Sequence, residues 1–153
     1  MRNGEFSTCK TTPEFINPLN IKDIMEKHVD EKYYLGEELS KWEYLKGAKK
    51  IQRVSKTGHS YTFSEGAIAF PDSIDKPART ILTSESSVNR STHVIRDIET
   101  NQLRLLTPIE AERIQGFADN WTNTGMPQSF RYFCMGNALV VDLVEKMGKS
   151  LNT

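Results

Sequence analysis

The sequence lacks both long apolar runs and a set of cysteines that could crosslink it. No apolar stretch approaches the roughly 20 residues that a membrane-spanning helix needs, and the mean hydropathy is −0.53. The two cysteines, Cys9 and Cys134, make no disulfide framework of the kind found in small secreted domains. The segment MRNGEFSTCKTT has no apolar core that could serve as a signal peptide. We therefore expect a soluble protein of a reducing cytoplasm.

The sequence also lacks a net charge, because 20 Lys and Arg residues balance 20 Asp and Glu residues. The charges are unevenly placed along the chain. Residues 13–45 hold 8 acids and 4 bases, whereas residues 46–96 hold 9 bases and 4 acids. The basic middle part could supply contacts to nucleic-acid phosphates. The alternative is a solvated surface of loops with mixed charge.

At 153 residues the chain fits one domain, or one small domain with an appended piece. Asn20 is typical of an N-cap and predicts a short helix from Ile21 to about His28. A second helix is expected from about Glu37 to Tyr44. The pattern then changes to short strands at 59–63, at 80–83 and from 93 to 95. Residues 99–102 indicate the turn of a hairpin that returns through 103–106.

The C-terminal third carries the clearest helix signals. Thr107 with Pro108 and Glu110 forms the pattern of a capping box, so we expect a helix that ends at Gly116. Arg113 lies within i,i+3 reach of Glu110. Asn137 is expected to cap a final helix from Ala138 to Met147 that is closed by Gly148. An apolar stripe would follow one side of that helix, formed by Leu139, Val140, Leu143, Val144 and Met147.

Two of these segments together resemble a known family. RLLTPIEAERIQGF at 104–117, and RY at 131–132 followed by MGNALV at 135–140, resemble the ninth and tenth conserved motifs of DNA (cytosine-5) methyltransferases. They stand in the family order and at about the family spacing. KPARTILT at 76–83 resembles the Thr-aliphatic step of the family's target-recognition domain, and 15–25 resembles the connector that enters it. Ala118 departs from the proline that is common in the family.

The resemblance implies an α+β chain in three parts. Residues 1–45 would be a leader and helical connector, 46–106 a small, irregular, mostly-β target-recognition domain, and 107–153 C-terminal helices. These helices would pack on an α/β Rossmann-type methyltransferase domain that the chain lacks. The family's Pro-Cys-Gln, Glu-Asn-Val and Gln-x-Arg-x-Arg motifs do not occur, nor does a Gly-rich cofactor loop. An N-terminal catalytic subunit or domain would have to supply them.

The resemblance and the basic segments together give the predicted site residues. Those expected to border S-adenosylmethionine are Asn137, Ala138, Leu139 and Val140. Those expected to contact double-stranded DNA are Arg79, Thr80, Ile81, Lys56, His59, Tyr61, Arg90 and His93. Those expected to form the structural motif are Arg104, Thr107, Glu110, Arg113, Gly116 and Gly136. No metal site is expected, because His59 and His93 are 34 residues apart and neither has a nearby Cys or second His.

Several alternatives stay open at this point. Cys134 could be a nucleophile activated by Arg131 and a helix start at Ala138, or a small buried hydrophobe. Asn137 could be no more than a capping residue. The chain could be a small subunit or fragment that binds duplex DNA and completes a partner's cofactor pocket. It could instead be a non-catalytic DNA-binding or interaction module, or a small enzyme that uses Cys134. An RNA target is a further alternative, since one family branch acts on tRNA.

Overall fold

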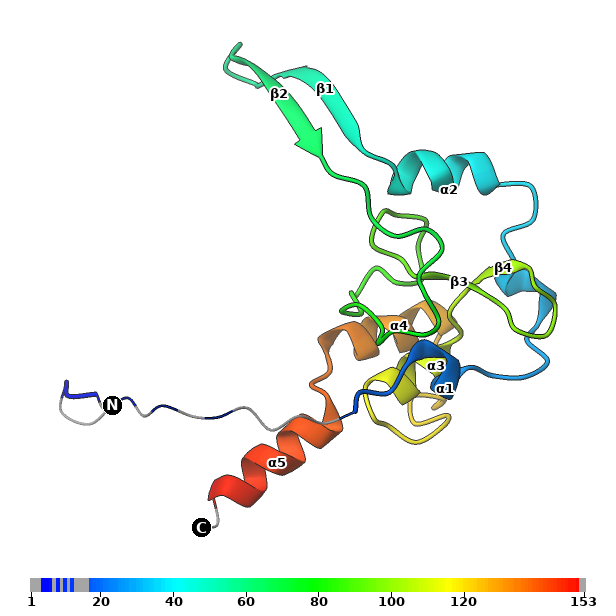
Figure 1. Cartoon of the computed structure of the whole chain (residues 1–153), viewed down its shortest axis with the longest axis vertical. Coiled ribbons are helices and arrows are strands. Elements are labelled where there is room, and N and C mark those ends of the chain that lie inside the picture. Colours follow the sequence, from blue (N-terminus) through cyan, green and yellow to red (C-terminus); the bar gives the residue numbers. More distant parts are fainter. Residues whose placement is uncertain (1–3, 7, 9, 11, 13–16, 152–153) are drawn as a thin grey trace.

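The computed structural model describes residues 4–6, 8, 10, 12 and 17–151 (Figure 1). Cys9 and the first residues of the predicted connector, from Phe15, lie outside them. The helices are α1 (Ile21–Ile24), the 3-10 turn η1 (Glu31–Tyr33), α2 (Leu39–Lys46), α3 (Pro108–Ile114), α4 (Gln128–Asn137) and α5 (Val141–Leu151). The strands are β1 (Lys49–Val54), β2 (Ser60–Glu65), β3 (Val94–Arg96) and β4 (Leu103–Leu105). Within the described residues, no helix is long and apolar enough to span a membrane.

The strands form two separate antiparallel hairpins. β1 pairs with β2, from Lys49 opposite Glu65 to Val54 opposite Ser60. β3 pairs with β4 and lies in the body of the protein. The β1–β2 hairpin extends away from that body beyond α2 (Figure 1). The strands expected near 59–63, 93–95 and 103–106 are confirmed, whereas β1 was not predicted.

The prediction of a strand at 80–83 is wrong. These residues form an extended loop that enters a turn, and Ile81 is buried in the core. High β-propensity produces a strand only where a neighbouring strand can pair with it. The 80–83 segment packs instead against α4.

The core draws on distant parts of the chain. Its buried side chains are Ile21, Ile24, Ile81, Ile95, Leu106, Ala111, Tyr132 and Met135. They come from the connector, from the predicted target-recognition region and from the C-terminal helices. These three regions therefore share one core.

The predicted capping box at α3 is confirmed. The Thr107 hydroxyl accepts a hydrogen bond from the Glu110 N–H at 3.1 Å, and the Glu110 carboxylate accepts one from the Thr107 N–H at 2.8 Å. The helix ends at Ile114, and Gly116 follows with φ +83°. This left-handed conformation favours glycine.

Two other helices differ from their predicted bounds. α1 ends at Ile24 and not at His28, and Met25 is already extended. The reason is tertiary, because the Glu26 N–H donates to the Glu110 carboxylate at 2.9 Å instead of continuing the helix. α2 begins and ends two residues later than expected.

The prediction that Asn137 caps the final helix is wrong. Asn137 is the last residue of α4, and its side-chain amide donates to the Phe133 carbonyl at 2.9 Å. α5 starts only at Val141 and continues through Gly148 to Leu151. Gly136 is therefore inside a helix, where glycine normally costs stability. A Cβ at Gly136 would lie 2.6 Å from the Thr83 Cα, so glycine permits the backbone of residues 82–83 to touch α4.

We expect Gly136→Ala to lower the free energy of unfolding by about 1–3 kcal/mol, because the added methyl group overlaps backbone that cannot move independently. Urea denaturation followed by circular dichroism measures this loss. Gly148→Ala is the matched control, since nothing lies within 4 Å of a Cβ at this position of α5. It should cost nothing and raise helix content. Equal behaviour of the two variants would contradict the proposed close contact.

Candidate functional site

The predicted motif residues converge on one buried ion cluster. Arg104 is 0% exposed. Its Nε donates to Asp97 at 2.7 Å, and its two terminal nitrogens donate to the two oxygens of Glu110 at 2.8 and 2.7 Å. Burial alone would raise the pKa of Asp97, but hydrogen bonds from Thr100 and Arg104 outweigh it and lower that pKa. Asp97 thus remains charged beside Arg104.

Glu110 also joins this cluster to the connector. Its carboxylate accepts from the N–H groups of Glu26 and Thr107 as well as from Arg104. The expected neighbour relation between Glu110 and Arg113 does not produce an ion pair. Arg113 instead pairs with Asp119 at 2.6 and 2.7 Å and donates to the Ile24 carbonyl at 2.9 Å. Glu110 and Arg113 therefore hold the connector against α3.

A second group of charges ties α2 and the β1–β2 hairpin to the body. Arg79 makes a two-point contact with Asp72 at 2.6 and 3.1 Å and donates to the Ser91 carbonyl at 3.0 Å. Arg90 donates to the carbonyls of Leu45 and Gly47 at 3.1 Å and to that of Gly66. Both guanidinium groups, which the sequence suggested for DNA contacts, are thus committed to protein partners.

Two of the predicted DNA contacts are wrong. Ile81 is 2% exposed and belongs to the core, and His93 is 0% exposed with its Nδ1 3.0 Å from the Glu85 carboxylate. Neither side chain can reach a base edge without unfolding the body. Sequence could not reveal this, because both positions follow polar, loop-like segments. Thr80 is exposed, and its role stays a prediction.

Lys46 lies beneath the hairpin, almost fully buried at 1% exposure. Its ammonium donates to the Thr92 carbonyl and lies 5.8 Å from the centre of the Trp42 ring. Burial lowers the pKa of Lys46 to about 8. The nearby acids Asp72 and Glu85 oppose this shift, while Arg79 and Arg90 add to it.

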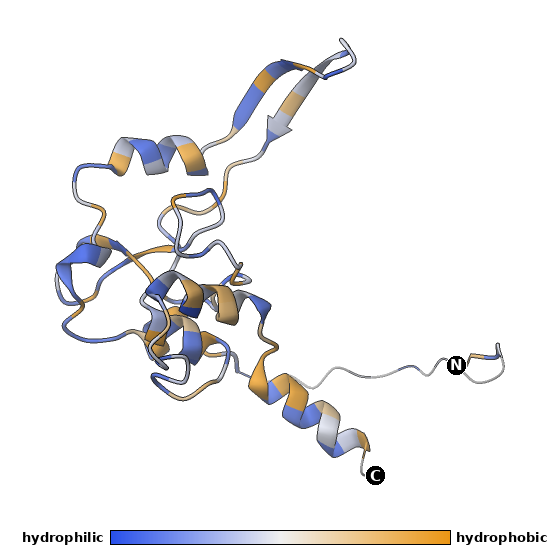
Figure 2. Ribbon diagram, turned by 180° about the vertical axis from the view of Figure 1, so that it is seen from behind, coloured by the Kyte–Doolittle hydropathy of each residue, from blue (hydrophilic) through white to orange (hydrophobic). Residues whose placement is uncertain are grey.

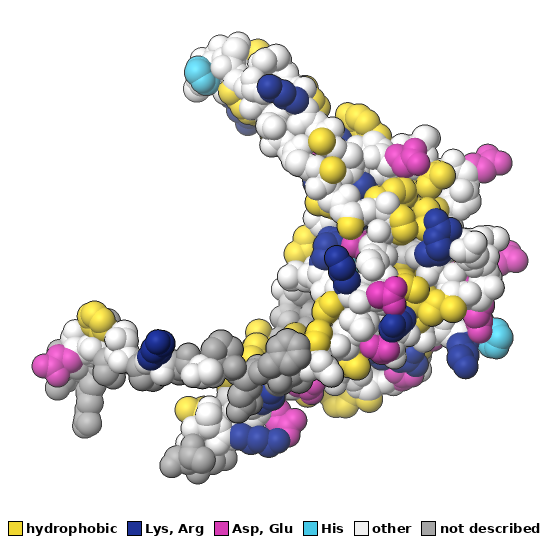
Figure 3. Space-filling model, viewed as in Figure 1, with side chains coloured by type: hydrophobic (Ala, Val, Ile, Leu, Met, Phe, Trp, Pro, Cys, Tyr) yellow, Lys and Arg dark blue, Asp and Glu magenta, His cyan; other side chains and the backbone are white. Residues whose placement is uncertain are grey.

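The remaining predicted DNA contacts gather on the β1–β2 hairpin. Tyr61 lies in β2, Lys56 and His59 lie in the turn before it, and all three are exposed. Residues 49–64 contain four Lys or Arg residues and no Asp or Glu. Figure 3 shows Lys or Arg side chains on this projecting hairpin. The sequence analysis did not predict β1, although the β-branched residues Ile51 and Val54 stand ahead of a Gly-containing turn.

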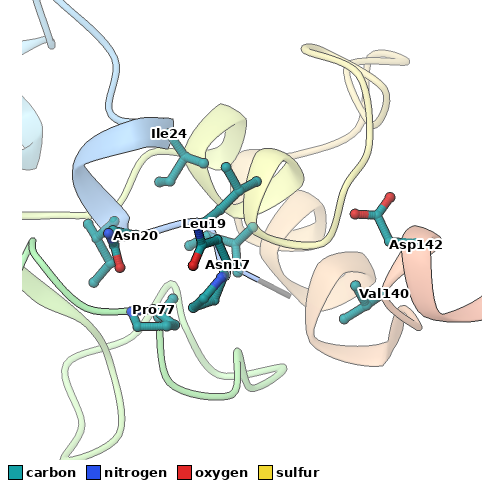
Figure 4. Close-up of a pocket in the computed structure, with 11 residues that line it drawn as sticks. Asn17, Leu19, Asn20, Ile24, Pro77, Val140 and Asp142 are labelled. Atoms are coloured by element: carbon teal, nitrogen blue, oxygen red, sulfur yellow. The ribbon is translucent and has the colours of Figure 1, made fainter. Parts of the chain in front are cut away.

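The segment predicted to border a cofactor links α4 to α5. Asn137, Leu139 and Val140 are exposed, and Ala138 packs against the core. Because Asn137 ends α4, it presents no helix N-terminus to a carboxylate. Val140 and Asp142 form one side of a cavity of about 250 Å³ (Figure 4). Residues of the connector, including Asn17, Leu19 and Ile24, face them from the other side.

The apolar stripe of α5 is uncovered. Leu143, Val144 and Met147 on the helix are 45–58% exposed, and Leu139 and Val140, which precede the helix in the structure, are 70% and 41% exposed. Figure 2 shows hydrophobic and hydrophilic residues alternating along α5, as expected for an amphipathic helix. Exposed apolar surface of this kind is typical of an interaction site. The predicted exposure of this stripe is confirmed.

Cys134 has the surroundings of a packing residue. It is half-buried and lies against the core formed by Ile81, Tyr132 and Met135. In the described part of the chain, no cluster of three or more His, Cys, Asp or Glu residues could hold a metal ion. The packing of Cys134 against the core favours the interpretation that it is a small hydrophobic residue and not a nucleophile.

Comparison with known proteins decides the family. The model of C-5 cytosine-specific DNA methylases matches residues 5–153. The chain belongs to this methylase family. It is also 50% identical over 152 residues to the type II methyltransferase M.Sau3AI of Staphylococcus aureus, a match that covers 99% of the chain and 36% of that protein. This methylase chain therefore spans little more than a third of the length of that relative.

Solved structures agree with the fold. Entamoeba histolytica methyltransferase EhMeth superimposes with a TM-score of 0.56 at 17% identity, over 96% of the chain and 43% of its own length. Schizosaccharomyces pombe Dnmt2 gives a TM-score of 0.55 at 18% identity, over 88% of the chain and 43% of its own length. The methylase chain is a mixed helix and strand structure whose structural neighbours are methyltransferases.

We expect Glu110→Gln in the methylase chain to lower the free energy of unfolding by about 3–5 kcal/mol, because it leaves Arg104 buried with too little negative charge. Chemical denaturation provides the measurement. Asp75→Asn is the matched control, since it breaks the exposed ion pair with Lys22. That change should cost no more than about 1 kcal/mol. Similar losses in the two variants would contradict the central role of the buried cluster.

The lowered pKa of Lys46 gives a pH dependence of stability. The folded state loses this proton near pH 8, whereas the unfolded chain holds it to about pH 10.4. The free-energy cost of burying the charged Lys46 ammonium is fully present below pH 8. This cost declines as the pH rises and the folded state loses the proton. Unfolding free energy should therefore increase between about pH 8 and 9.5, with a slope of at most about 1.4 kcal/mol per pH unit. Lys46→Met should abolish that increase, and an unchanged slope in this variant would rule out Lys46 as its source.

Proposed function

We propose that this chain is the target-recognition and C-terminal portion of a DNA cytosine-5 methyltransferase. In this role it binds duplex DNA and acts with a catalytic part that carries the thiolate. The observation that carries the proposal is that one body presents two unlike, unpartnered surfaces. The β1–β2 hairpin is basic and the stripe of α5 is apolar. Membership of the methylase family supports the same division of roles.

The hairpin is the part suited to DNA. Residues 49 to 64 contain four cations and no acid, and two of these cations, Lys50 and Lys56, are exposed and have no ion pair in the described structure. Contacts of Lys and Arg with phosphates supply most of the non-specific affinity of DNA-binding proteins. Lys56, His59 and Tyr61 at the outer part of the hairpin remain our candidates for contact, together with Thr80 on the body.

The α5 stripe is the part suited to a protein partner. Leu143, Val144 and Met147 are 54%, 45% and 58% exposed, and water contact with such side chains is unfavourable. The relative M.Sau3AI extends well beyond the region that this chain matches. We propose that the corresponding catalytic part covers the stripe. The catalytic motifs that the chain lacks would be supplied by that part.

The same contact would place residues 137–140 at the edge of a cofactor pocket. The segment fits this role as an exposed rim, since Asn137 and Leu139 are open to solvent beside the cavity at Val140. It does not fit as a complete site, because the acidic Asp142 stands in the first turn of α5 and would repel a carboxylate. S-adenosylmethionine, when bound, supplies the methyl group. Asn137 to Val140 would bind its outer side while the catalytic part holds the remainder.

The test is reconstitution. The chain is mixed with the part of M.Sau3AI outside the matched region, duplex DNA and S-adenosylmethionine labelled in its methyl group. We expect methyl transfer to cytosine from the mixture and none from either component alone. No transfer, together with no DNA binding by the mixture, would overturn the proposal. DNA binding without transfer would favour a non-catalytic DNA-binding module.

A matched pair of variants tests the docking surface in the same assay. Leu143→Gln combined with Met147→Gln should abolish transfer and association while leaving the unfolding transition of the isolated chain unchanged, since both side chains are exposed. Lys149→Gln introduces the same side chain on the polar side of α5 and should leave transfer intact. Equal effects of the two variants would show that the stripe is not the contact surface.

A further inference from the structure

The β1–β2 hairpin has two chemically different faces. Residues opposite each other in an antiparallel pair lie on the same face, and successive residues alternate. The aromatic face consists of Lys49, Ile51, Arg53, Tyr61, Phe63 and Glu65. The polar face consists of Lys50, Gln52, Val54, Ser60, Thr62 and Ser64. Every residue of the polar face is exposed, and the described structure packs no helix or strand extensively against the hairpin.

Four of the six side chains of the aromatic face make contacts within the protein. The Arg53 guanidinium lies 3.9 Å from the centre of the Phe63 ring. Near the body, the Lys49 ammonium lies 4.5 Å from the Tyr44 ring and 4.0 Å from the Glu65 carboxylate. These contacts stiffen the hairpin and turn its base toward α2. The cations of this face already have partners.

The polar face holds one oriented amide at its centre. Gln52 and Thr62 are directly opposite, and the Gln52 Nε2 donates to the Thr62 hydroxyl at 2.9 Å. This bond fixes the amide plane. The Gln52 Oε1 and the second N–H of Nε2 make no other hydrogen bond in the described part of the chain, so one acceptor and one donor of this exposed amide stay available. The small neighbours Ser60 and Ser64 permit a flat surface to approach closely.

We propose that the β1–β2 hairpin enters the major groove of DNA with its polar face toward the base edges, and that Gln52 reads adenine there. The major groove admits a two-stranded ribbon, and the paired donor and acceptor of a glutamine amide match N7 and N6 of adenine. Lys50 and Lys56, which have no acid between them, contact the phosphates on either side. Thr62 is a positioning residue that orients Gln52. This inference rests on the proposed function and names the element that performs the recognition.

The experiment selects duplexes with a randomised central segment for binding to the full chain. The unmodified chain should enrich a site that contains adenine at one fixed position, and Gln52→Met should lower binding to that site by about 5- to 150-fold and abolish the preference at that position. Thr62→Val keeps the strand but removes the acceptor, and should weaken the same preference only. Ile51→Val, on the aromatic face, should change neither affinity nor preference.

A second variant separates base recognition by Gln52 from the electrostatic attraction of the lysines to DNA phosphates. Lys56→Gln should weaken binding to all duplexes alike and reduce the slope of log affinity against log salt by about 0.9. Enrichment of one site by both the unmodified chain and Gln52→Met would overturn this inference and leave the proposed function standing. Binding to no duplex would overturn both. Equally tight binding to double-stranded RNA would overturn the placement in the major groove, because the A-form major groove is too narrow for side chains to read.

Discussion

The ion cluster of Arg104, Asp97 and Glu110 is the constraint on which the other features depend. A guanidinium at zero exposure is tolerated only when every donor has a charged or carbonyl partner. Those partners come from β4, from the turn after β3 and from the first turn of α3. The Glu26 N–H adds the connector to the same carboxylate. The segment that resembles the ninth conserved motif therefore connects four segments of the chain at once.

Hydrogen bonds and close packing connect this ion cluster to α4, and α4 to the predicted target-recognition region. The Tyr132 hydroxyl donates to the Leu106 carbonyl at 2.6 Å, next to the capping box, and the Gln115 amide donates to the Met135 carbonyl at 2.9 Å. One turn of helix later, Gly136 admits the backbone of residues 82–83. That contact places the loop that carries Thr80. The loop that carries Thr80 is thus linked to the ion cluster through packed atoms of α4.

The parts of this arrangement that sequence predicts are those with local causes. Thr107, Pro108 and Glu110 stand within four positions and define the start of α3 without help from the rest of the chain. The Gly136-Asn137 step looked equally local, because glycine and asparagine usually mark helix ends. Here glycine is required by the close contact with the backbone of Thr83, which is 53 positions away in the sequence. The reason for this glycine is therefore a tertiary contact and not a helix end. The same holds for His93, whose burial depends on Glu85 and on a core that no local pattern describes.

The hairpin that carries the proposed reading face is the least supported element of the fold. An isolated two-stranded hairpin is marginally stable in water. Its base is nevertheless secured, because Arg90 holds the carbonyls of Leu45, Gly47 and Gly66, and these residues precede and follow the two strands. Its outer part relies on Arg53 over Phe63 and on the Gln52–Thr62 bond. A fixed base and a less supported tip suit an element that recognises DNA. The base of the hairpin would determine which groove the hairpin enters, and the tip could adjust to the local shape of the DNA.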